Sequence, residues 1–351
     1  MTVLESLRKL PKVQLHCHLE GSVRAETFAE LAAKYRVPTE YRPDGAESDT
    51  APPAADSIYH FVGFKEFLFK FAAVCRSLQQ PNDYARVLRE YAQDAADHGV
   101  MYAELLVSPP VWRFFHSDLI VDRVFEKLYA AAQQVEAQRG PRIRFICDLT
   151  RNFGVKNCIE TAQLAVKTKH YGVVALGLGG DEANFPASDF REAFAVAREG
   201  GLHGVAHAGE AAGAQSVKDA VEILRAERIG HGVRAVEDRK VLDLLKERNI
   251  ALEVCPTSNF RTGAAAREKQ HPLVDLHKAG VPLMIDSDDP AIFETDITQE
   301  YAYAESIAGM DAVLAFAHRA IHASFAETSL KEEMDQKLAR ASAELFTSRR
   351  S

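Results

Sequence analysis

The sequence predicts an α/β protein built as a (β/α)8 TIM barrel, with extra helices after the first strand and at the C-terminus. Two observations support this fold class: short apolar runs alternate with helical patterns along nearly the whole chain, and eight such runs are present. Strand–helix alternation indicates a parallel sheet, and eight units favour a closed barrel over an open sheet. One barrel can account for all 351 residues, so we expect a single domain over residues 1–351.

The predicted strands are rich in Val, Ile and Leu, and most of them lack a clean alternation of apolar and polar residues. Parallel strands that are buried on both faces have this composition. The eight strands are expected at residues 13–18, 100–107, 142–149, 173–178, 203–208, 228–232, 251–255 and 282–286.

The segments between the strands carry the periodicity of amphipathic helices. In one of them, five apolar residues lie on one helical face: Tyr84, Val87, Leu88, Tyr91 and Ala95. Asp83 is expected to cap this helix, and Gly99 is expected to end it. Ser216 and Asp219 have the spacing of a capping box, which predicts the start of another helix.

Two segments fall outside this alternation. Residues 38–60 contain four prolines and many small polar residues, so we expect a long mobile loop after the first unit. Residues 302–351 carry helical patterns, and we expect them to pack outside the barrel.

The composition limits the classes of partner. The formal net charge is −8, from 42 basic and 50 acidic residues, and the absence of a Lys or Arg run argues against nucleic-acid or membrane partners. Five cysteines without a C-x-x-C pair indicate reduced thiols. No signal peptide and no run of ~18–20 apolar residues is found, so we expect a soluble, cytoplasmic protein with a small-molecule substrate. The oligomeric state stays open.

The first predicted strand contains two histidines, His16 and His18, two residues apart. Side chains alternate between the faces of a strand, so both imidazoles point the same way. Two buried imidazoles need polar partners, and a divalent metal would satisfy both. For an isolated H-x-H motif, a hydrogen-bonded pair in the core explains the pattern equally well.

Further polar clusters follow other predicted strands. His207 and Glu210 end the fifth strand, His231 ends the sixth, and residues 286–290 follow the eighth. Active sites of barrels lie at the C-terminal ends of the strands, where all of these residues would meet. Together, the clusters favour a metal site.

Imidazole nitrogens with one carboxylate suit zinc and leave an open position for water. The fourth strand ends without a lysine that could bridge two metals, so we expect one zinc ion per chain. Glu210 and His231 are candidates for proton transfer at the same end of the barrel. Asp288 and Asp289 are adjacent and cannot both point the same way, so one would bind the metal and the other would meet the substrate.

Six motifs in this order resemble those of the adenosine deaminase family of the amidohydrolase superfamily. They are PKVQLHCHLEGS at 11–22, GDE at 180–182, HAGE at 207–210, IGHG at 229–232, CPTSN at 255–259 and DSDDP at 286–290. The set spans nearly the whole predicted barrel and is highly specific, whereas H-x-H alone is not.

The resemblance implies a set of roles. Zinc would be held by four residues: His16, His18, His207 and Asp288. Glu210 would protonate the purine nitrogen N1, and its pKa should be raised by burial for this purpose. His231 would orient the attacking water and help to deprotonate it. Asp289 would contact N7, and the backbone N–H of Gly180 would contact N3. Attack of hydroxide at C6 would be followed by loss of ammonia.

A second similarity concerns the segment at residues 64–71. Four apolar residues, Phe64, Phe67, Leu68 and Phe71, have the spacing of one helical face. In the family, a similar helix forms an apolar gate over the nucleoside. Packing of this face against the barrel explains the pattern equally well.

One position departs from the family pattern. Adenosine deaminases usually carry H-x-H-L-D-G, whose aspartate contacts the 5′-hydroxyl of the ribose, but this chain has Glu20 there. H-x-H-x-E-G occurs in adenine deaminases and in some aminodeoxyfutalosine deaminases. The resemblance therefore predicts zinc-dependent deamination of the 6-amino group of adenosine or deoxyadenosine. The alternatives are adenine, a 5′-modified adenosine such as 6-aminodeoxyfutalosine, or a catalytically inactive purine-binding barrel.

Overall fold

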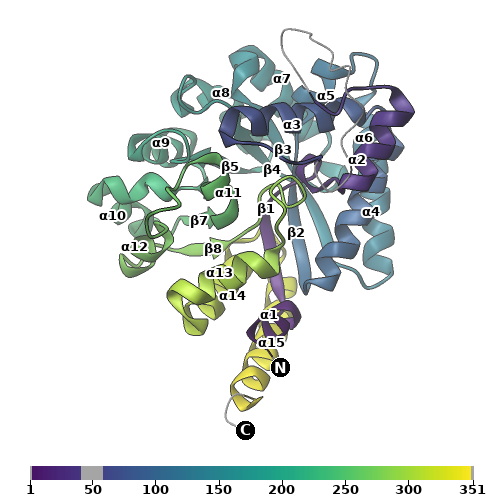
Figure 1. Cartoon of the computed structure of the whole chain (residues 1–351). Coiled ribbons are helices and arrows are strands. Elements are labelled where there is room, and N and C mark those ends of the chain that lie inside the picture. The colour runs from purple at the N-terminus through teal and green to yellow at the C-terminus, as the bar shows by residue number, and fades with distance from the viewer. Residues whose placement is uncertain (1, 41–57, 349–351) are drawn as a thin grey trace.

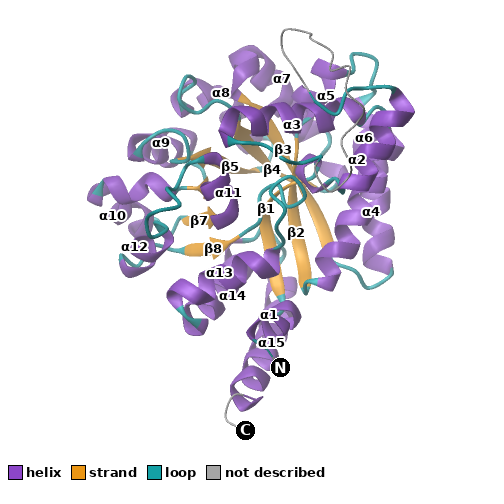
Figure 2. Ribbon diagram, in the orientation of Figure 1, coloured by secondary structure: helices purple, strands orange, loops and turns teal. Residues whose placement is uncertain are grey.

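The computed structural model of the protein describes residues 2–40 and 58–348. At its centre lies one parallel sheet of eight strands, hydrogen-bonded in sequence order. The strands are β1 (Lys12–His18), β2 (Val100–Val107), β3 (Arg142–Thr150), β4 (Val173–Gly179), β5 (His203–Ala208), β6 (Arg228–His231), β7 (Ala251–Val254) and β8 (Leu283–Ile285). Figure 2 shows these strands surrounded by helices.

The ring of strands is completed by a parallel bridge between Cys17 of β1 and Asp288, which follows β8. Asp288 accepts a hydrogen bond from the His18 N–H at 2.9 Å and donates its own N–H to the His16 carbonyl at 3.0 Å. The predicted barrel is therefore confirmed. All eight predicted strands are present, and their ends are displaced by at most one residue.

The strands form because both of their faces are buried, as their composition predicts. Every residue of β1, β6, β7 and β8 is buried. The outer faces pack on the surrounding helices, and the largest apolar cluster of the protein lies at this interface. Such double burial favours Val, Ile and Leu over an alternating pattern.

The helices are α1 (Val3–Lys9), α2 (Ala25–Tyr35), α3 (Gly63–Ser77), α4 (Pro81–Asp97), α5 (Pro109–Phe115), α6 (Val121–Ala137), α7 (Gly154–Lys167), α8 (Arg191–Glu199), α9 (Ala214–Asp219), α10 (Arg239–Glu247), α11 (Pro256–Thr262), α12 (Leu273–Lys278), α13 (Ile297–Ala308), α14 (Met310–Ala323) and α15 (Thr328–Ser348). α2 and α3 are the extra helices after the first strand, and the chain ends in three helices, as predicted. In Figure 1, α1 and α15 lie at the lower end of the barrel.

Two predicted helix starts are wrong. The helix α4 begins two residues before Asp83, because Pro81 occupies its first position, which proline favours. Asp83 instead accepts a hydrogen bond from the N–H of Gln80 at 2.8 Å. The helix α9 begins at Ala214, so Ser216 lies inside the helix and does not cap it.

The predictions for the two segments outside the strand–helix alternation compare differently with the structure. Most of the predicted loop at residues 38–60 lies outside the described residues, because residues 41–57 are not described. The predicted helices at the C-terminus are α13, α14 and α15, and α14 packs against β1 and β8. Within residues 2–40 and 58–348, no helix is both long enough and apolar enough to cross a membrane.

Candidate active site

A cavity of about 360 Å³ opens at the C-terminal ends of the strands. Its polar wall contains most of the predicted site: His18, Gly180, His207, Glu210, His231, Asp288 and Asp289. Its apolar wall comes from α3, from the segment at residues 111–115 and from Phe153. Ser108 after β2 and Asp148 of β3 border it too, so residues from seven of the eight strand ends meet in one space, as the barrel topology requires.

Four predicted ligands converge at the bottom of this cavity. They are His16, His18, His207 and Asp288, and all four are buried. Nε2 of His18 lies 3.3 Å from Nε2 of His207. Oδ1 of Asp288 lies 3.4 Å from Nε2 of His16 and 3.4 Å from Nε2 of His18. Ligands at about 2.0–2.1 Å from a tetrahedral zinc ion are about 3.3–3.4 Å apart, so the spacing fits this metal.

The hydrogen bonds of His16 and His207 also fit a metal site. Nδ1 of His16 lies 2.7 Å from Glu253, and Nδ1 of His207 lies 3.1 Å from the carbonyl of Leu178. Each Nδ1 can donate its proton to this acceptor, which leaves the lone pair of Nε2 directed at the metal position. Nε2 of His16 is buried and has no hydrogen-bond partner among the described residues. A metal ion would satisfy this nitrogen.

Asp288 is held both through its side chain and through its backbone. Its Oδ2 accepts a hydrogen bond of 2.6 Å from the hydroxyl of Ser258, so Oδ1 remains for a metal. Its backbone is in the left-handed region with φ of 63°, which is uncommon for a residue with a side chain. The bridge to β1 holds this conformation, and the same backbone both closes the barrel and aims the carboxylate.

A relay of hydrogen bonds orients His231. His271 is neutral because burial lowers its pKa to about 4, and its Nδ1 accepts from the N–H of Leu273. Its proton is therefore on Nε2, which lies 3.3 Å from Oδ1 of Asn259. The Asn259 amide then turns Nδ2 toward Nδ1 of His231, at 3.1 Å. Nδ1 of His231 is thus an acceptor, and the relay places the proton on Nε2, 3.6 Å from Oε2 of Glu210.

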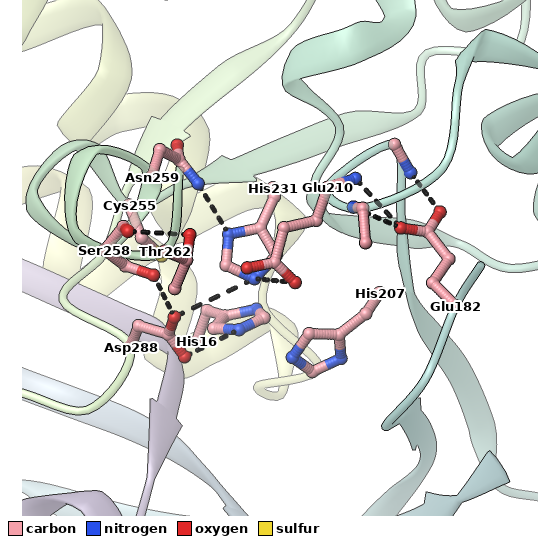
Figure 3. Close-up of polar contacts among 12 residues, drawn as sticks. His16, Glu182, His207, Glu210, His231, Cys255, Ser258, Asn259, Thr262 and Asp288 are labelled. Carbon is pink, nitrogen blue, oxygen red and sulfur yellow. Dashed lines mark hydrogen bonds and ion pairs between the residues drawn. The ribbon is translucent and has the colours of Figure 1, made fainter. Parts of the chain in front are cut away.

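Glu210 lies beside His231 (Figure 3), and both side chains border the cavity. Burial raises the pKa of its carboxyl, with smaller contributions from the charges of Asp288 and Glu182, as the sequence predicted. The turn that carries Glu210 is held by Glu182, whose carboxylate accepts four backbone N–H groups. They belong to Gly209 at 2.6 Å, Glu210 at 3.1 Å, Ala211 at 2.7 Å and Ala212 at 2.9 Å.

Asp289 also borders the cavity, and it is 2% exposed. Its Oδ1 is buried and has no hydrogen-bond partner among the described residues. Burial and the neighbouring Asp288 raise the pKa of its carboxyl well above the ordinary value. Gly21 makes room for this side chain, since a Cβ at Gly21 would lie 1.9 Å from Asp289 Oδ1. This contact explains why a glycine follows Glu20.

Gly180 forms a turn beside the cavity. Its φ is +94°, and a Cβ there would lie 2.6 Å from Oδ1 of Asn152. The turn is fixed because Asn152 Oδ1 accepts the N–H of Asp181 at 3.0 Å. Only glycine therefore fits this position without strain.

All four residues of the predicted gate border the cavity: Phe64, Phe67, Leu68 and Phe71. The ring of Phe71 is 6.1 Å from that of His18. Phe67 is buried, with an exposed fraction of 8%, and also packs against the ring of Phe293, whereas Leu68 is 40% exposed. This face of α3 therefore takes part in both core packing and the cavity wall.

Glu20 differs from the other predicted residues, because it is fully buried and does not border the cavity. Its Oε1 accepts hydrogen bonds from the N–H of Ser108 at 3.0 Å and from Nε1 of Trp112 at 2.6 Å. Oε2 has no hydrogen-bond partner among the described residues. The longer side chain is therefore held by the start of α5.

Sequence reasoning missed several residues around the site. They are Asp148, Glu182, Glu253, Ser258, Asn259 and His271. Asp148 borders the cavity, and burial raises its pKa to about 8. A charged residue inside an apolar run, such as Asp148 in RIRFICDL or Glu253 in ALEVC, was the available signal. Glu182, Ser258 and Asn259 lay within motifs that were quoted without a role for these residues.

Comparisons with known proteins agree with this site. The sequence profile of the family described as adenosine deaminase matches residues 11–341. An aminodeoxyfutalosine deaminase of Streptomyces coelicolor is 38% identical over 309 residues, which cover 86% of this chain and 76% of the relative. An adenosine deaminase of Klebsiella pneumoniae is 38% identical over 302 residues, which cover 86% of this chain and 89% of the relative.

The fold matches as well. The crystal structure of an adenine deaminase from Arthrobacter aurescens superposes with a TM-score of 0.85 at 26% identity, covering 94% of this chain and 98% of the other. The relatives thus carry three different substrate names. From the profile match and these identities, the chain belongs to the adenosine deaminase family and is a hydrolase that acts on carbon–nitrogen bonds of cyclic amidines.

Proposed function

We propose that the protein deaminates the adenine ring of adenosine or deoxyadenosine, giving inosine or deoxyinosine and ammonia, with one zinc ion per chain. The observation that carries this proposal is the convergence of three histidines and one aspartate, at tetrahedral spacing, next to Glu210 and His231. His16, His18, His207 and Asp288 would hold the zinc. Bound zinc would supply hydroxide at neutral pH, because it lowers the pKa of water to about 7.

The residues of the chain supply the remaining steps of this proposal. Glu210 donates a proton to N1 of the purine, which its raised pKa favours because the carboxyl stays protonated at higher pH. His231 orients the attacking water through Nε2, since its Nδ1 is engaged by Asn259. Asp289 donates a hydrogen bond to N7, which is an acceptor, and its raised pKa favours the protonated carboxyl that this requires. Gly180 offers its N–H to N3. These contacts fix the ring so that C6 faces the water.

A second candidate substrate is a 5′-modified adenosine, and two observations favour it. Glu20 is engaged by Ser108 and Trp112 and does not border the cavity, so it is not positioned to bind a 5′-hydroxyl. The outer part of the cavity is apolar and includes Phe114 and Phe115 beside α3. Free adenine would leave this outer wall without a contact. A 5′-substituent with an apolar body would cover it.

A substrate panel tests these alternatives. Purified protein is assayed for ammonia release from adenosine, deoxyadenosine, adenine and adenosines with apolar 5′-substituents, and kcat/KM is compared. We expect adenosine or its 5′-modified forms to exceed adenine. A preference for adenine would contradict the nucleoside proposal. If zinc-loaded protein turned over none of these compounds, the result would favour the inactive purine-binding alternative.

The roles of Glu210 and zinc can be tested together. Glu210→Gln should lower kcat by roughly 100-fold or more, because general acid catalysis contributes about 10²–10⁴-fold. Its zinc content should equal that of the unsubstituted protein, because Glu210 is not among the proposed ligands. Full activity in this variant would refute the role of Glu210 as proton donor.

A further inference from the structure

A second cluster of metal-ligating side chains lies outside the cavity. Within the described residues, three sets of His, Cys, Asp or Glu side chains have ligand atoms within 4.8 Å of one another, and two of these sets share Asp288. The third set consists of His318, His322 and Asp335. None of the steps proposed above uses these three residues.

The cluster joins two helices. His318 and His322 are four residues apart on α14, so both imidazoles lie on the same helical face. Histidines at this spacing on one helix are a known arrangement for zinc ligands. Asp335 comes from α15, the helix that follows α14 in the chain and packs against it. A metal bound here would therefore connect the two helices.

The distances fit a single ion. Nε2 of His318 lies 3.2 Å from Nε2 of His322. Nε2 of His322 lies 2.7 Å from Oδ2 of Asp335, and Nε2 of His318 lies 3.7 Å from Oδ1 of the same carboxylate. These values bracket the separation of about 3.3–3.4 Å between ligands of a tetrahedral zinc ion. The ligand atoms in the cavity have similar separations, of 3.3 and 3.4 Å.

Protein hydrogen bonds alone leave one oxygen of this cluster without a partner. Oδ1 of Asp335 is buried and has no hydrogen-bond partner among the described residues. The two Nε2 atoms face each other, so at least one of them must carry a proton to avoid the approach of two lone pairs. A cation would accept both lone pairs and the carboxylate at once. The exposed fractions of His318 and His322 are 61% and 45%, so water can reach the remaining coordination position.

The cluster lies at the opposite end of the barrel from the cavity. His322 borders a small cavity together with His203 and Ala251, which are the first residues of β5 and β7. Figure 1 draws α15 in yellow at the lower end of the picture, beside α1. Met334 and Leu338 are the buried apolar residues of α15 in its described part. Because this apolar contact is small, a metal would add a substantial tie between α15 and the barrel.

We propose that His318, His322 and Asp335 form a second, structural binding site for a divalent transition metal, with zinc as the best match. Two imidazoles and one carboxylate leave a fourth position to water, and this donor set suits zinc. The ion fixes α15 on α14, and α14 packs against β1 and β8. The site exchanges its metal more readily than the buried site in the cavity, since its histidines are exposed.

The test uses the full-length protein with zinc as the only added ligand. Protein freed of metal by a chelator is equilibrated with micromolar free zinc, and bound zinc is measured by elemental analysis. We expect two zinc ions per chain for the unsubstituted protein and one for His322→Ala. His16→Ala should also bind one zinc ion, because this variant loses the proposed site in the cavity. A stoichiometry of one in the unsubstituted protein would overturn the proposal.

Matched variants separate a specific site from surface binding. Asp335→Asn keeps the size of the side chain. It should weaken binding of the second zinc ion by roughly 100-fold or more, since the loss of an outer-shell partner alone costs about 10–100-fold. His170→Ala removes an exposed histidine whose Nδ1 lies near the carbonyl of Lys167, and it should retain both ions. Retention of the second ion in Asp335→Asn and in His322→Ala would overturn the proposal, as would its loss in His170→Ala.

Thermal unfolding gives a readout that does not depend on catalysis. A second equivalent of zinc should raise the Tm of the unsubstituted protein, because a ligand that binds only the folded state stabilises it. The rise should be absent in His322→Ala and Asp335→Asn, which keep the residues of the cavity and should keep deaminase activity. An equal rise in these variants would show that the stabilising zinc binds elsewhere, and it would refute the structural role.

Discussion

The carboxylate of Glu253 lies 2.7 Å from Nδ1 of His16, at the floor of the cavity. Its other oxygen lies 2.6 Å from Nε of Arg228, and Arg228 also pairs with Glu104 at 2.7 Å. All four side chains are buried. A single buried network thus joins a proposed metal ligand to the strands β2, β6 and β7, and it fixes the imidazole before any metal binds.

We expect Glu253→Gln to weaken zinc binding by about 10–100-fold, the range found for partners that orient metal ligands. The glutamine oxygen can still accept the His16 proton, but the negative charge that raises the basicity of the imidazole is lost. Zinc affinity is measured by competition with a chelator. Glu237→Gln, in an exposed ion pair with Arg234, serves as control and should bind zinc normally. Unchanged affinity in Glu253→Gln would refute the orienting role.

Glu182 should control the catalytic rate without touching the metal. In the unsubstituted protein, both carboxylate oxygens of Glu182 accept backbone N–H groups. Glu182→Gln leaves only one oxygen acceptor for them, so the turn bearing Glu210 should shift. Small displacements of catalytic groups can cost about 100-fold in rate, and we expect kcat to fall by roughly that factor.

The comparison for Glu182→Gln is Glu192→Gln on the exposed face of α8, which should have normal kcat. Zinc content should be unchanged in both variants. A fall in zinc content that parallels the fall in kcat would mean that Glu182 acts on the metal site and not on the turn.

The barrel and the convergence of the four proposed metal ligands could be predicted from sequence because they depend on short-range patterns. Strand composition follows from burial on both faces, and His16 and His18 share a face because side chains alternate. The parallel topology then brings the strand ends together, so residues far apart in sequence could be assigned to one site.

The supporting residues were not predictable in the same way. Glu253 and Arg228 meet across neighbouring strands, and their pairing depends on register, which no local pattern encodes. Asn259 was visible as part of a motif, but its role depends on His271, twelve residues later in the chain. The orientation of Glu20 depends on Trp112, whose position on α5 only the tertiary structure gives.

A buried acid away from the metal site should govern part of the pH dependence of stability. Glu300 on α13 accepts hydrogen bonds from Thr257 and Thr295, and burial raises its pKa from 4.5 to about 7. A raised carboxyl pKa favours folding at low pH, and this contribution is lost as the pH rises from 4.5 through about 7. The loss is up to about 3 kcal/mol in the free energy of unfolding.

Glu300→Gln removes the titrating proton and keeps an acceptor for Thr257. The free energy of unfolding, from denaturant titrations at pH 5 and pH 8, should therefore fall less with rising pH in the variant than in the unsubstituted protein. Glu294→Gln, on an exposed residue, is the control and should follow the unsubstituted protein. Parallel pH dependences for Glu300→Gln and the unsubstituted protein would contradict the assignment.

Gly21→Ala should disable the proposed substrate contact of Asp289, because the new Cβ would lie 1.9 Å from Oδ1 and 2.5 Å from Cγ of that carboxyl group. We expect kcat/KM to fall by roughly 100-fold, since the carboxylate must leave its position. Gly213→Ala is the control, because only the flexible ends of Glu237 and Arg234 approach its Cβ, at 3.0 Å and 3.9 Å. A double-mutant cycle locates the effect: if Gly21→Ala acts through Asp289, adding it to Asp289→Ala should cost little more activity. Additive losses would show that the alanine disturbs another part of the site.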